Sequence, residues 1–507
     1  MDHVQETMDI IGRERELDIL AQCSGKGKAV LVYGRRRIGK TTLLEEHCKD
    51  RDSIYLTCLD TTVATNLRMM CGTLAEYASA DAGEHPGFED LSRLLAMTLG
   101  KGSVTVVIDE YQYLIRKDRE ADSWMQIVID RTLKRTDSTL ILCGSTIGTM
   151  RGLAEDGRGP LFGRFSRIIN LGPLSLEDTR GMHPGMPGED LLQLYLAIGG
   201  IPRYHIEMRG RSFEEFVRLE CIESRWVEEE ASFMVMSEYK SPYKVEAVLT
   251  SIACGRTRLK DIASASGLDE PECLKILREL ESNGAVGRRT GMLSSPKRPE
   301  YLILDPLLSF CHGFLIPKGS MLRMRDGSRA YDELTPHIRT YLGKRFELFC
   351  RDYIADNYAV TEMGSWWMDD AKNDVHEDID IVARVSEGRN TVGILGECKF
   401  TSNPAGFHEY NALARRSARF DPSANNRLMI LSVSGFDEEF SEFAAETGVI
   451  LIGPEELYGG APAPRLSRGG SPTTVWHMPF PQVSRVSIVI IRARVIFINR
   501  LHLTNPR

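Results

Sequence analysis

Residues 34–41 have the composition of a loop that binds the phosphates of a nucleotide. They read Gly-Arg-Arg-Arg-Ile-Gly-Lys-Thr, follow the apolar run 29–33 and precede a helical segment, which is the context that the pattern GxxxxGK[ST] requires. Glycines let backbone N–H groups surround phosphate oxygens, and the start of the helix adds a positive dipole end. Lys40 would reach the β- and γ-phosphates, and the Thr41 hydroxyl would ligate Mg²⁺. The site predicted for ATP and Mg²⁺ comprises Gly34, Arg35, Arg36, Arg37, Ile38, Gly39, Lys40, Thr41 and Thr42.

An acidic pair after a second apolar run is the expected partner of this loop. Asp109 and Glu110 close the run 104–109, 69 residues after Lys40. An acidic residue at the end of a buried strand suits the surroundings of Mg²⁺, and the following glutamate could polarise a water for attack on the γ-phosphate. The alternative is a strand end with solvated acids. Ser145 or Thr146, after the run 139–145, is either a sensor of the γ-phosphate or part of a plain turn.

Carboxylates near the C-terminus indicate a second chemical site. Glu397 and Lys399 are two apart in an extended run, so both point to one face of a sheet. Asp380 lies between two isoleucines on a neighbouring predicted strand. Asp380 and Glu397 could hold Mg²⁺ while Lys399 orients or activates a water, with Glu347 in the preceding helix as a further ligand. The alternative is a solvated sheet edge whose acids pair with Lys399.

The hydrophobic pattern predicts the elements that would position these residues. Between residues 10 and 170, short apolar runs at 29–33, 53–58, 104–109 and 139–145 alternate with amphipathic segments. This alternation is typical of an α/β domain, in which a parallel sheet is covered on both faces. A glycine- and proline-rich linker follows at 180–190, and residues 190–240 are expected to be helical.

Two further folded parts follow the helical segment. Residues 241–303 show three helices and a hairpin, the order of a winged helix, with a small-residue turn at 265–267. Its second helix, about 270–282, is rich in glutamate, so contact with DNA would fall to basic residues around it (Arg256, Arg258, Lys260, Arg288, Arg289, Lys297 and Arg298). Packing against the first domain is the alternative use. From about 330, a long amphipathic helix precedes four extended runs, which predicts a second, smaller α/β unit.

Composition narrows the classes of protein. The 507 residues are 42% hydrophobic and carry a net charge of −8, which is typical of a globular multi-domain protein and argues against bulk coating of nucleic acid. The eleven cysteines have no CxxC pair, so reduced thiols are expected. No signal peptide or apolar span is evident, and we expect a cytoplasmic protein without membrane contact. The tail, residues 459–507, begins with a low-complexity linker. Its basic remainder is an accidental extension of the reading frame, an unstructured end or a functional element.

The order and spacing of several segments resemble the archaeal and bacterial ATPase family of AAA+-type P-loop proteins, which are related to STAND and replication-initiator ATPases. The segments are IIGRERELDIL, YGRRRIGKTTLL, VVIDEYQYL, LCGST, GPLFGRFSRIINLGPLS and GGIPRY, and they extend to about residue 210. The resemblance implies that residues 12–14 lie near the adenine. It also implies that Arg164 acts on the γ-phosphate, from the same chain or from a neighbour, unless it forms only a surface ion pair.

The C-terminal segments GKRFELFCRDYI, DIDIVA and GECKF resemble the PD-(D/E)xK nuclease fold, which has the restriction-endonuclease-like α/β architecture. The resemblance covers about 335–457 and implies that Asp380, Glu397 and Lys399 are catalytic. Proline is absent before Asp380, where the name of the motif places one.

We therefore expect an ATPase domain (1–180), a helical lid (190–240), a winged helix (241–315), a nuclease-like domain (330–458) and a tail (459–507). The predicted function is Mg²⁺-dependent ATP hydrolysis coupled to DNA processing, with DNA and a second copy of the chain as candidate partners. One alternative is a signalling switch whose C-terminal domain binds a partner without cleavage. Another is a DNA-binding regulator with an inactive nuclease fold. The sequence assigns no separate roles to Arg35, Arg36 and Arg37.

Overall fold

The computed structural model describes residues 10–289, 300–323, 327–370, 375–388, 390–420, 426–466, 490–491 and 494–495. The chain divides into two compact units, and the boundary between them lies after Arg345. The finer boundaries expected between ATPase, lid and winged helix stay predictions, as does the start of the C-terminal domain.

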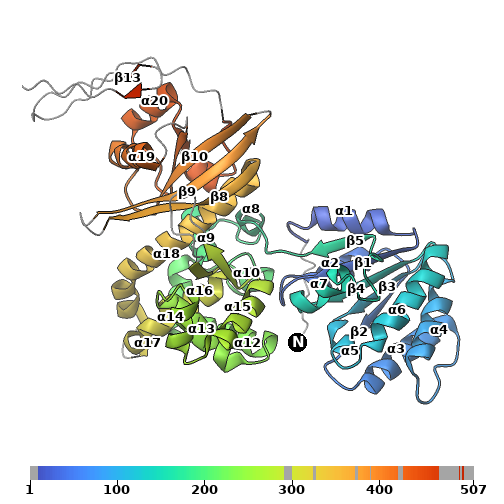
Figure 1. Ribbon diagram of the computed structural model, residues 1–507. Coiled ribbons are helices and arrows are strands. Elements are labelled where there is room, and N and C mark those ends of the chain that lie inside the picture. Colours follow the sequence, from blue (N-terminus) through green and yellow to red (C-terminus); the bar gives the residue numbers. More distant parts are fainter. Residues whose placement is uncertain are drawn as a thin grey trace, which may run out of the picture. The chain divides into compact units, whose positions relative to one another are not determined.

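A five-stranded parallel sheet forms the centre of the N-terminal part (Figure 1). Its strands are β1 (Lys28–Tyr33), β2 (Ser53–Thr57), β3 (Thr105–Asp109), β4 (Thr139–Gly144) and β5 (Arg167–Asn170). The order is β2-β3-β4-β1-β5, so β4 lies between β1, which precedes the phosphate loop, and β3, which ends at Asp109. Four of these strands were predicted. The edge strand β5 was not, because three of its four residues are exposed and no apolar run marks it.

Helices cover this sheet and bury a large apolar core. Alternate residues of β1, β2, β3 and β4 pack with α3, α4 and α6, which Figure 1 shows gathered on one side. The three inner strands β1, β3 and β4 are buried on both faces, as in other parallel sheets, and therefore read as continuous apolar runs. The helices are α1 (Glu14–Cys23), α2 (Lys40–Cys48), α3 (Val63–Ala78), α4 (Phe88–Leu99), α5 (Gln112–Ile115), α6 (Glu120–Arg131), η1 (Leu133–Arg135) and α7 (Ile147–Glu155).

The rest of the first unit is mostly helical and contains the predicted three helices and hairpin. The helical region begins with α8 (Leu176–Arg180), α9 (Gly188–Ile198), α10 (Pro202–Glu207), α11 (Phe213–Glu215), η2 (Phe216–Glu223) and α12 (Trp226–Glu238). It continues with α13 (Pro242–Ala253), α14 (Leu259–Ser266), α15 (Glu270–Ser282), the antiparallel strands β6 (Val286–Arg289) and β7 (Glu300–Ile303), α16 (Pro306–Phe310), η3 (Cys311–Leu315) and α17 (Ile316–Arg323). The element order is therefore that of a winged helix, whereas Lys297 and Arg298 lie outside the described residues.

The second unit is a mixed sheet with its own core. The long helix α18 (Gly327–Asn357) leads into β8 (Val360–Asp370), β9 (Val375–Glu387), β10 (Asn390–Lys399), α19 (Phe407–Phe420), β11 (Arg427–Ser432), α20 (Glu438–Thr447), β12 (Ile450–Ile452) and α21 (Pro454–Leu457). Strands β8, β9 and β10 are antiparallel, whereas β10, β11 and β12 are parallel. Side chains of β8–β11 and helices α19 and α20 form the core. This agrees with the predicted separate α/β unit.

None of the described helices is long and apolar enough to cross a membrane. Of the predicted tail, residues 459–466 are described, together with the short strands β13 (Ile490–Ile491) and β14 (Arg494–Val495). The rest of the tail lies outside the described residues.

Candidate nucleotide-binding site and C-terminal carboxylates

The phosphate loop joins β1 to α2 through glycines that its geometry requires. Gly39 has φ +92° at the residue before α2, a conformation that side chains disfavour. A Cβ atom added to Gly34 would lie 2.4 Å from the carbonyl oxygen of Leu171. Arg37 also has a positive φ of 66°. The predicted loop therefore has the strained, compact backbone of a phosphate cradle.

Lys40 folds back over its own loop. Its ammonium donates hydrogen bonds of 3.0 Å to the carbonyl oxygens of both Gly34 and Arg35, and the residue is only 6% exposed. These carbonyls satisfy a buried charge only in part, because charges prefer ionic partners when water is excluded. The ammonium is thus held inside the cradle, where phosphate oxygens would replace weak acceptors.

Thr41 and Asp109 meet at the end of the sheet, as predicted. The Thr41 hydroxyl donates to Asp109 Oδ2 over 3.1 Å, and the Tyr55 hydroxyl donates to the same oxygen over 2.7 Å. Burial, reinforced by Asp109, raises the pKa of Tyr55, so the phenol remains a donor. A hydroxyl and a carboxylate in contact are suitable oxygen ligands for Mg²⁺, with the remaining positions left to phosphate and water.

Glu110 and Ser145 also come together. The Ser145 hydroxyl donates to Glu110 Oε2 over 2.8 Å, and the Gln112 amide nitrogen contacts the same carboxylate oxygen. Gln112 also accepts a hydrogen bond from the Ser145 backbone over 3.2 Å. Glu110 has φ +54°, an uncommon conformation that is typical of functional turns. Because β4 lies between β1 and β3, Ser145 stands between the loop and Glu110, as a sensor would.

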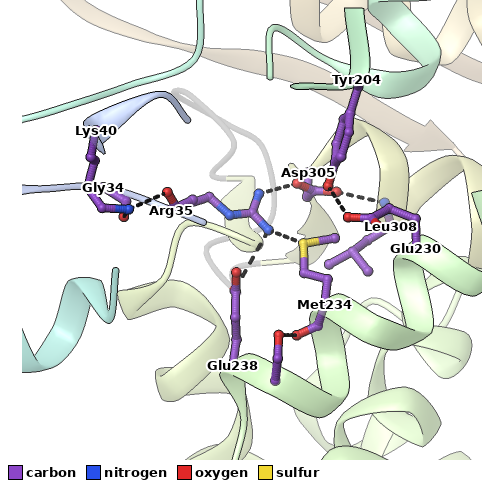
Figure 2. A network of polar contacts seen from close by, with 10 residues as sticks. Gly34, Arg35, Lys40, Tyr204, Glu230, Met234, Glu238, Asp305 and Leu308 are labelled. Atoms are coloured by element: carbon purple, nitrogen blue, oxygen red, sulfur yellow. Dashed lines mark hydrogen bonds and ion pairs between the residues drawn. The ribbon is translucent and has the colours of Figure 1, made fainter. Parts of the chain in front are cut away.

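Arg35 of the loop binds acidic groups that are distant in the sequence (Figure 2). Arg35 forms an ion pair with Asp305, lies 4.0 Å from Glu238 and contacts the Met234 sulfur. Burial lowers the pKa of Arg35, but Asp305 and Glu238 more than offset this effect, so the guanidinium stays charged. Asp305 also accepts a 2.7 Å hydrogen bond from the backbone of Leu308 and thereby caps α16. Arg35 thus connects the loop to α12 and to the start of α16.

Arg37 and Arg36 have different partners. Arg37 forms an ion pair with Glu230 of α12 and lies 5.2 Å from the centre of the Phe233 ring. Burial raises the pKa of Glu230, and the attraction of Arg37 opposes this rise. Arg36 donates to the Tyr113 hydroxyl in α5, close to Glu110 in the sequence. Arg35 and Arg37 thus form ion pairs with α12, whereas Arg36, which lines the same pocket beside α12, bonds to the segment after β3.

Two residues implied by the family resemblance have structural partners. The Arg164 guanidinium donates to Asp130 of α6 over 2.9 Å, and no hydrogen bond or ion pair joins it to the phosphate loop within the described residues. Arg13 donates to the carbonyl oxygens of Ile38 and Gly172 over 3.2 and 2.8 Å and so braces the loop from its other end. In this structure Arg164 therefore forms an ordinary ion pair, which was the alternative to a role at the γ-phosphate.

The end of helix α15 lies against helix α7. Arg151 of α7 donates to the Ser282 hydroxyl over 3.4 Å, and an added Cβ at Gly148 would lie 3.0 Å from that hydroxyl oxygen. Glutamates of α15 pair with lysine and arginine side chains of the same region, as in Lys244–Glu272 and Arg288–Glu281. The end of α15 thus contacts α7, and two of its glutamates have basic partners within the chain.

In the second unit, Asp380, Glu397 and Lys399 lie on neighbouring strands as predicted. Asp380 Oδ2 accepts a 2.9 Å hydrogen bond from the backbone nitrogen of Cys398. Lys399 and Arg416 each place a nitrogen 2.8 Å from the buried Glu397 carboxylate. Burial, followed by the charges of Glu397 and Glu347, raises the pKa of Asp380 to about 7.

The metal ligands predicted for this unit are only partly assembled. The effect of Glu347 on the pKa of Asp380 places a third carboxylate in the neighbourhood. Nevertheless, in the part of the chain that the structure describes, no three His, Cys, Asp or Glu residues are arranged to hold a metal ion. Arg416 and Lys399 supply the positive charge that balances Glu397.

Residues 10–208 match the model of an ATPase domain found predominantly in Archaea. Residues 10–208 are therefore similar to this ATPase domain. Residues 312–413 match the model of a family of archaeal and bacterial proteins of unknown function. An uncharacterized protein of Methanocaldococcus jannaschii is 25% identical over 389 residues, which cover 74% of this chain and 84% of that protein.

Two solved structures are also similar to the chain. A Walker-type ATPase of Pyrococcus abyssi has 19% identity and a TM-score of 0.45, over 60% of this chain and 96% of that one. The ORC2 protein of Aeropyrum pernix, solved with ADPNP and ADP, has 14% identity and a TM-score of 0.40, over 67% and 97%.

Sequence reasoning missed several residues of the ATPase domain's site. Tyr55 and Gln112 bind Asp109 and Glu110. Tyr55 lies in a predicted strand and Gln112 in the segment VVIDEYQYL, but neither was assigned a role. Gln112 stands two residues after Glu110, and this short spacing could have identified it. Glu230 and Asp305 carry no local signal, because only the tertiary fold brings them to the arginines of the loop.

Proposed function

We propose that this protein is a Mg²⁺-dependent ATP hydrolase whose nucleotide state controls the docking of its lid and three-helix region. The observation that carries the proposal is the convergence of Lys40, Thr41, Asp109 and Glu110 at one end of the parallel sheet. The positive φ of Gly39 and the close approach of Leu171 to Gly34 require glycine at both positions, and such a loop supports a phosphate ligand. The match of residues 10–208 to the model of an ATPase domain supports the same reaction.

The residues divide the chemistry among themselves. Lys40 neutralises the β- and γ-phosphates, and its present carbonyl acceptors are weaker partners than phosphate oxygens. Thr41 and Asp109 would hold Mg²⁺, which supplies positive charge to the phosphate oxygens. Glu110 polarises the attacking water, and Ser145 and Gln112 fix the direction of its carboxylate.

The arginines of the loop provide the connection to the helices. Arg35 is bound to Asp305 and Glu238, and Arg37 is bound to Glu230. A change in the loop on nucleotide binding or hydrolysis would therefore act directly on α12 and on the start of α16. The contact between α7 and Ser282 offers a second route, since α7 follows the strand that ends near Ser145. Both routes favour a winged helix that packs within the chain over one that reads DNA.

Replacing Lys40 with alanine tests the proposed reaction. We expect ATP turnover to fall by about 10²–10³-fold, because the positive charge that the transition state requires is lost. The measurement is phosphate release with Mg²⁺, beside nucleotide affinity. Lys49→Ala removes an exposed lysine just after the same helix and should leave turnover unchanged. Equal turnover in Lys40→Ala and the unchanged chain would refute the assignment of the site.

A second candidate activity is Mg²⁺-dependent cleavage of DNA by the C-terminal unit. The observation that favours it is the cluster of Asp380, Glu397 and Lys399, in which burial and neighbouring carboxylates raise the pKa of Asp380 to about 7. Carboxylates that repel one another in this way gain from binding a divalent cation. Arg416 would have to leave Glu397 when the cation binds. A binding-only domain of a signalling switch, or a DNA-binding domain without cleavage, is the competing proposal.

Lys399→Ala distinguishes these proposals. If the unit is a nuclease, nicking of supercoiled plasmid with Mg²⁺ should fall by about 10²-fold or more, since the residue that orients the water is lost. Arg384→Ala, which removes a half-exposed arginine from β9, is the matched control and should retain cleavage. If the unchanged chain cuts no plasmid with or without ATP, the C-terminal unit binds a partner instead, and the nuclease proposal fails.

A further inference from the structure

We propose that Arg36 is the arginine that contacts the γ-phosphate of ATP and stabilises the charge that develops during hydrolysis, within the same chain. The inference rests on the proposed ATPase function. It replaces Arg164 in that role and separates Arg36 from its two neighbours. Three observations support it: the partners of the three arginines, the reach of Arg36, and the engagement of Arg164.

The first observation concerns charge. Arg35 and Arg37 are each neutralised by carboxylates of the helical region. Among the described residues, Arg36 has no carboxylate within 4.0 Å, and its polar partner is the neutral hydroxyl of Tyr113. Glu238 lies close enough to feel the charge of Arg36, but its ion pair is with Arg35. Arg36 is thus a cation of the phosphate loop whose charge is not balanced by a direct ionic partner, and an anion would supply one.

The second observation is placement. Arg36 belongs to the loop that surrounds the phosphates, and its guanidinium reaches Tyr113, in the helix that begins two residues after Glu110. The side chain therefore spans from the phosphate loop to the segment that carries the water-polarising carboxylate. The γ-phosphate must lie between these two elements, because Lys40 acts on it from the loop and Glu110 acts on the water that attacks it.

The contact with Tyr113 is one that a phosphate can replace. A phenol is a neutral acceptor, and charge-assisted bonds between arginine and phosphate oxygens are roughly twice as strong as bonds between neutral groups. Arg36 is partly exposed, so it can turn without disrupting a core. Arg35, by contrast, would have to abandon a buried ion pair.

The third observation concerns Arg164, the other candidate for this role. Arg164 is bound to Asp130, and Lys134 binds the same carboxylate. Hydrogen bonding from Lys134 and from Arg164 lowers the pKa of Asp130, although burial opposes this, so the carboxylate stays charged and retains its partners. For Arg164 to reach a γ-phosphate, in its own chain or in a neighbour, it would have to leave this pair.

The test compares Arg36→Met with Arg164→Ala in the full chain. Measurements are ATP turnover per chain at several protein concentrations, affinity for ADP, and affinity for ADP with aluminium fluoride, which mimics the transferring phosphate. For Arg36→Met we expect turnover to fall by about 10³-fold or more. The affinity for ADP should be preserved, but aluminium fluoride should no longer make ADP bind more tightly. Arg36→Lys should restore part of this effect of aluminium fluoride. Tyr113→Phe removes only the resting partner and should keep turnover near that of the unchanged chain.

The outcomes separate the two proposals. Preserved ADP affinity in Arg36→Met shows that the variant is folded. If aluminium fluoride still raises the ADP affinity of Arg36→Met as it does that of the unchanged chain, the role of Arg36 is refuted. If Arg164→Ala loses that gain and turnover per chain rises with protein concentration, the arginine comes from a neighbour and the inference is likewise refuted. If the unchanged chain itself hydrolyses no ATP, the proposed function fails, which is a different result.

Discussion

A Glu110→Gln variant is expected to bind ATP but to hydrolyse it about 10²–10⁴-fold more slowly, the range expected when a general base is removed. Glutamine has nearly the same shape and can still meet Ser145, so the left-handed turn at this residue is retained. What it loses is the negative charge that withdraws a proton from the attacking water. The measurements are single-turnover hydrolysis and the equilibrium affinity for ATP.

The control for this prediction is Glu120→Gln, which changes an exposed glutamate at the start of α6. It should hydrolyse ATP at the unchanged rate. Retained turnover in Glu110→Gln would mean that another group polarises the water. Parallel loss of ATP affinity and turnover would instead indicate that Glu110 supports the loop structure, and it would refute the assigned role.

An Asp305→Ala variant is expected to lose about 3–5 kcal/mol of unfolding free energy, the cost of breaking a buried ion pair by removing one partner. Its side chain is 4% exposed, and that of Arg35 is 16% exposed, so water cannot replace the lost carboxylate fully. The Glu238 carboxylate lies 4.0 Å from the Arg35 guanidinium and would replace the lost negative charge of Asp305 in part. The change also removes the hydrogen bond that caps α16. Urea unfolding without nucleotide is the measurement.

Asp269→Ala separates the ion pair from the cap. Asp269 caps α15 in the same way, through a 2.7 Å hydrogen bond from Glu272, but it has no arginine partner among the described ion pairs. It should cost only about 0.5–2 kcal/mol, as the loss of a helix cap does. The double variant Arg35→Met with Asp305→Ala should recover part of the lost stability, because the Arg35 charge is no longer buried without Asp305; the recovery is partial because Glu238 also loses its partner. Equal costs for Asp269→Ala and Asp305→Ala would contradict a structural role for the ion pair.

These expected results depend to different degrees on sequence and on tertiary structure. The phosphate loop could be predicted because its chemistry is local: a strand end, two glycines, Lys40 and Thr41 follow one another within a few residues. The acidic pair at 109 and 110 was predictable for the same reason, since a buried strand delivers its last residue to the carboxyl edge of a parallel sheet. In the C-terminal unit, the period of two placed Glu397 and Lys399 on one face, and the structure joins them by an ion pair.

The partners of these residues could not be predicted, because they are brought together by strand order and helix packing. Strand β4 inserts between β1 and β3, and this alone brings Ser145 to Glu110. Arg35 meets Asp305 across 270 positions of sequence, and no periodicity or spacing encodes such a pair.

The sequence by itself therefore determined the glycine-rich loop with Lys40 and Thr41, the acidic pair at 109 and 110, and a second group of carboxylates near the C-terminus. Only the tertiary structure decided what the three loop arginines do. Adjacent residues of identical type are indistinguishable in a sequence, but a compact loop turns each side chain in a different direction. Two of them, Arg35 and Arg37, meet carboxylates of the helical region, and Arg36 turns toward the segment that follows Glu110.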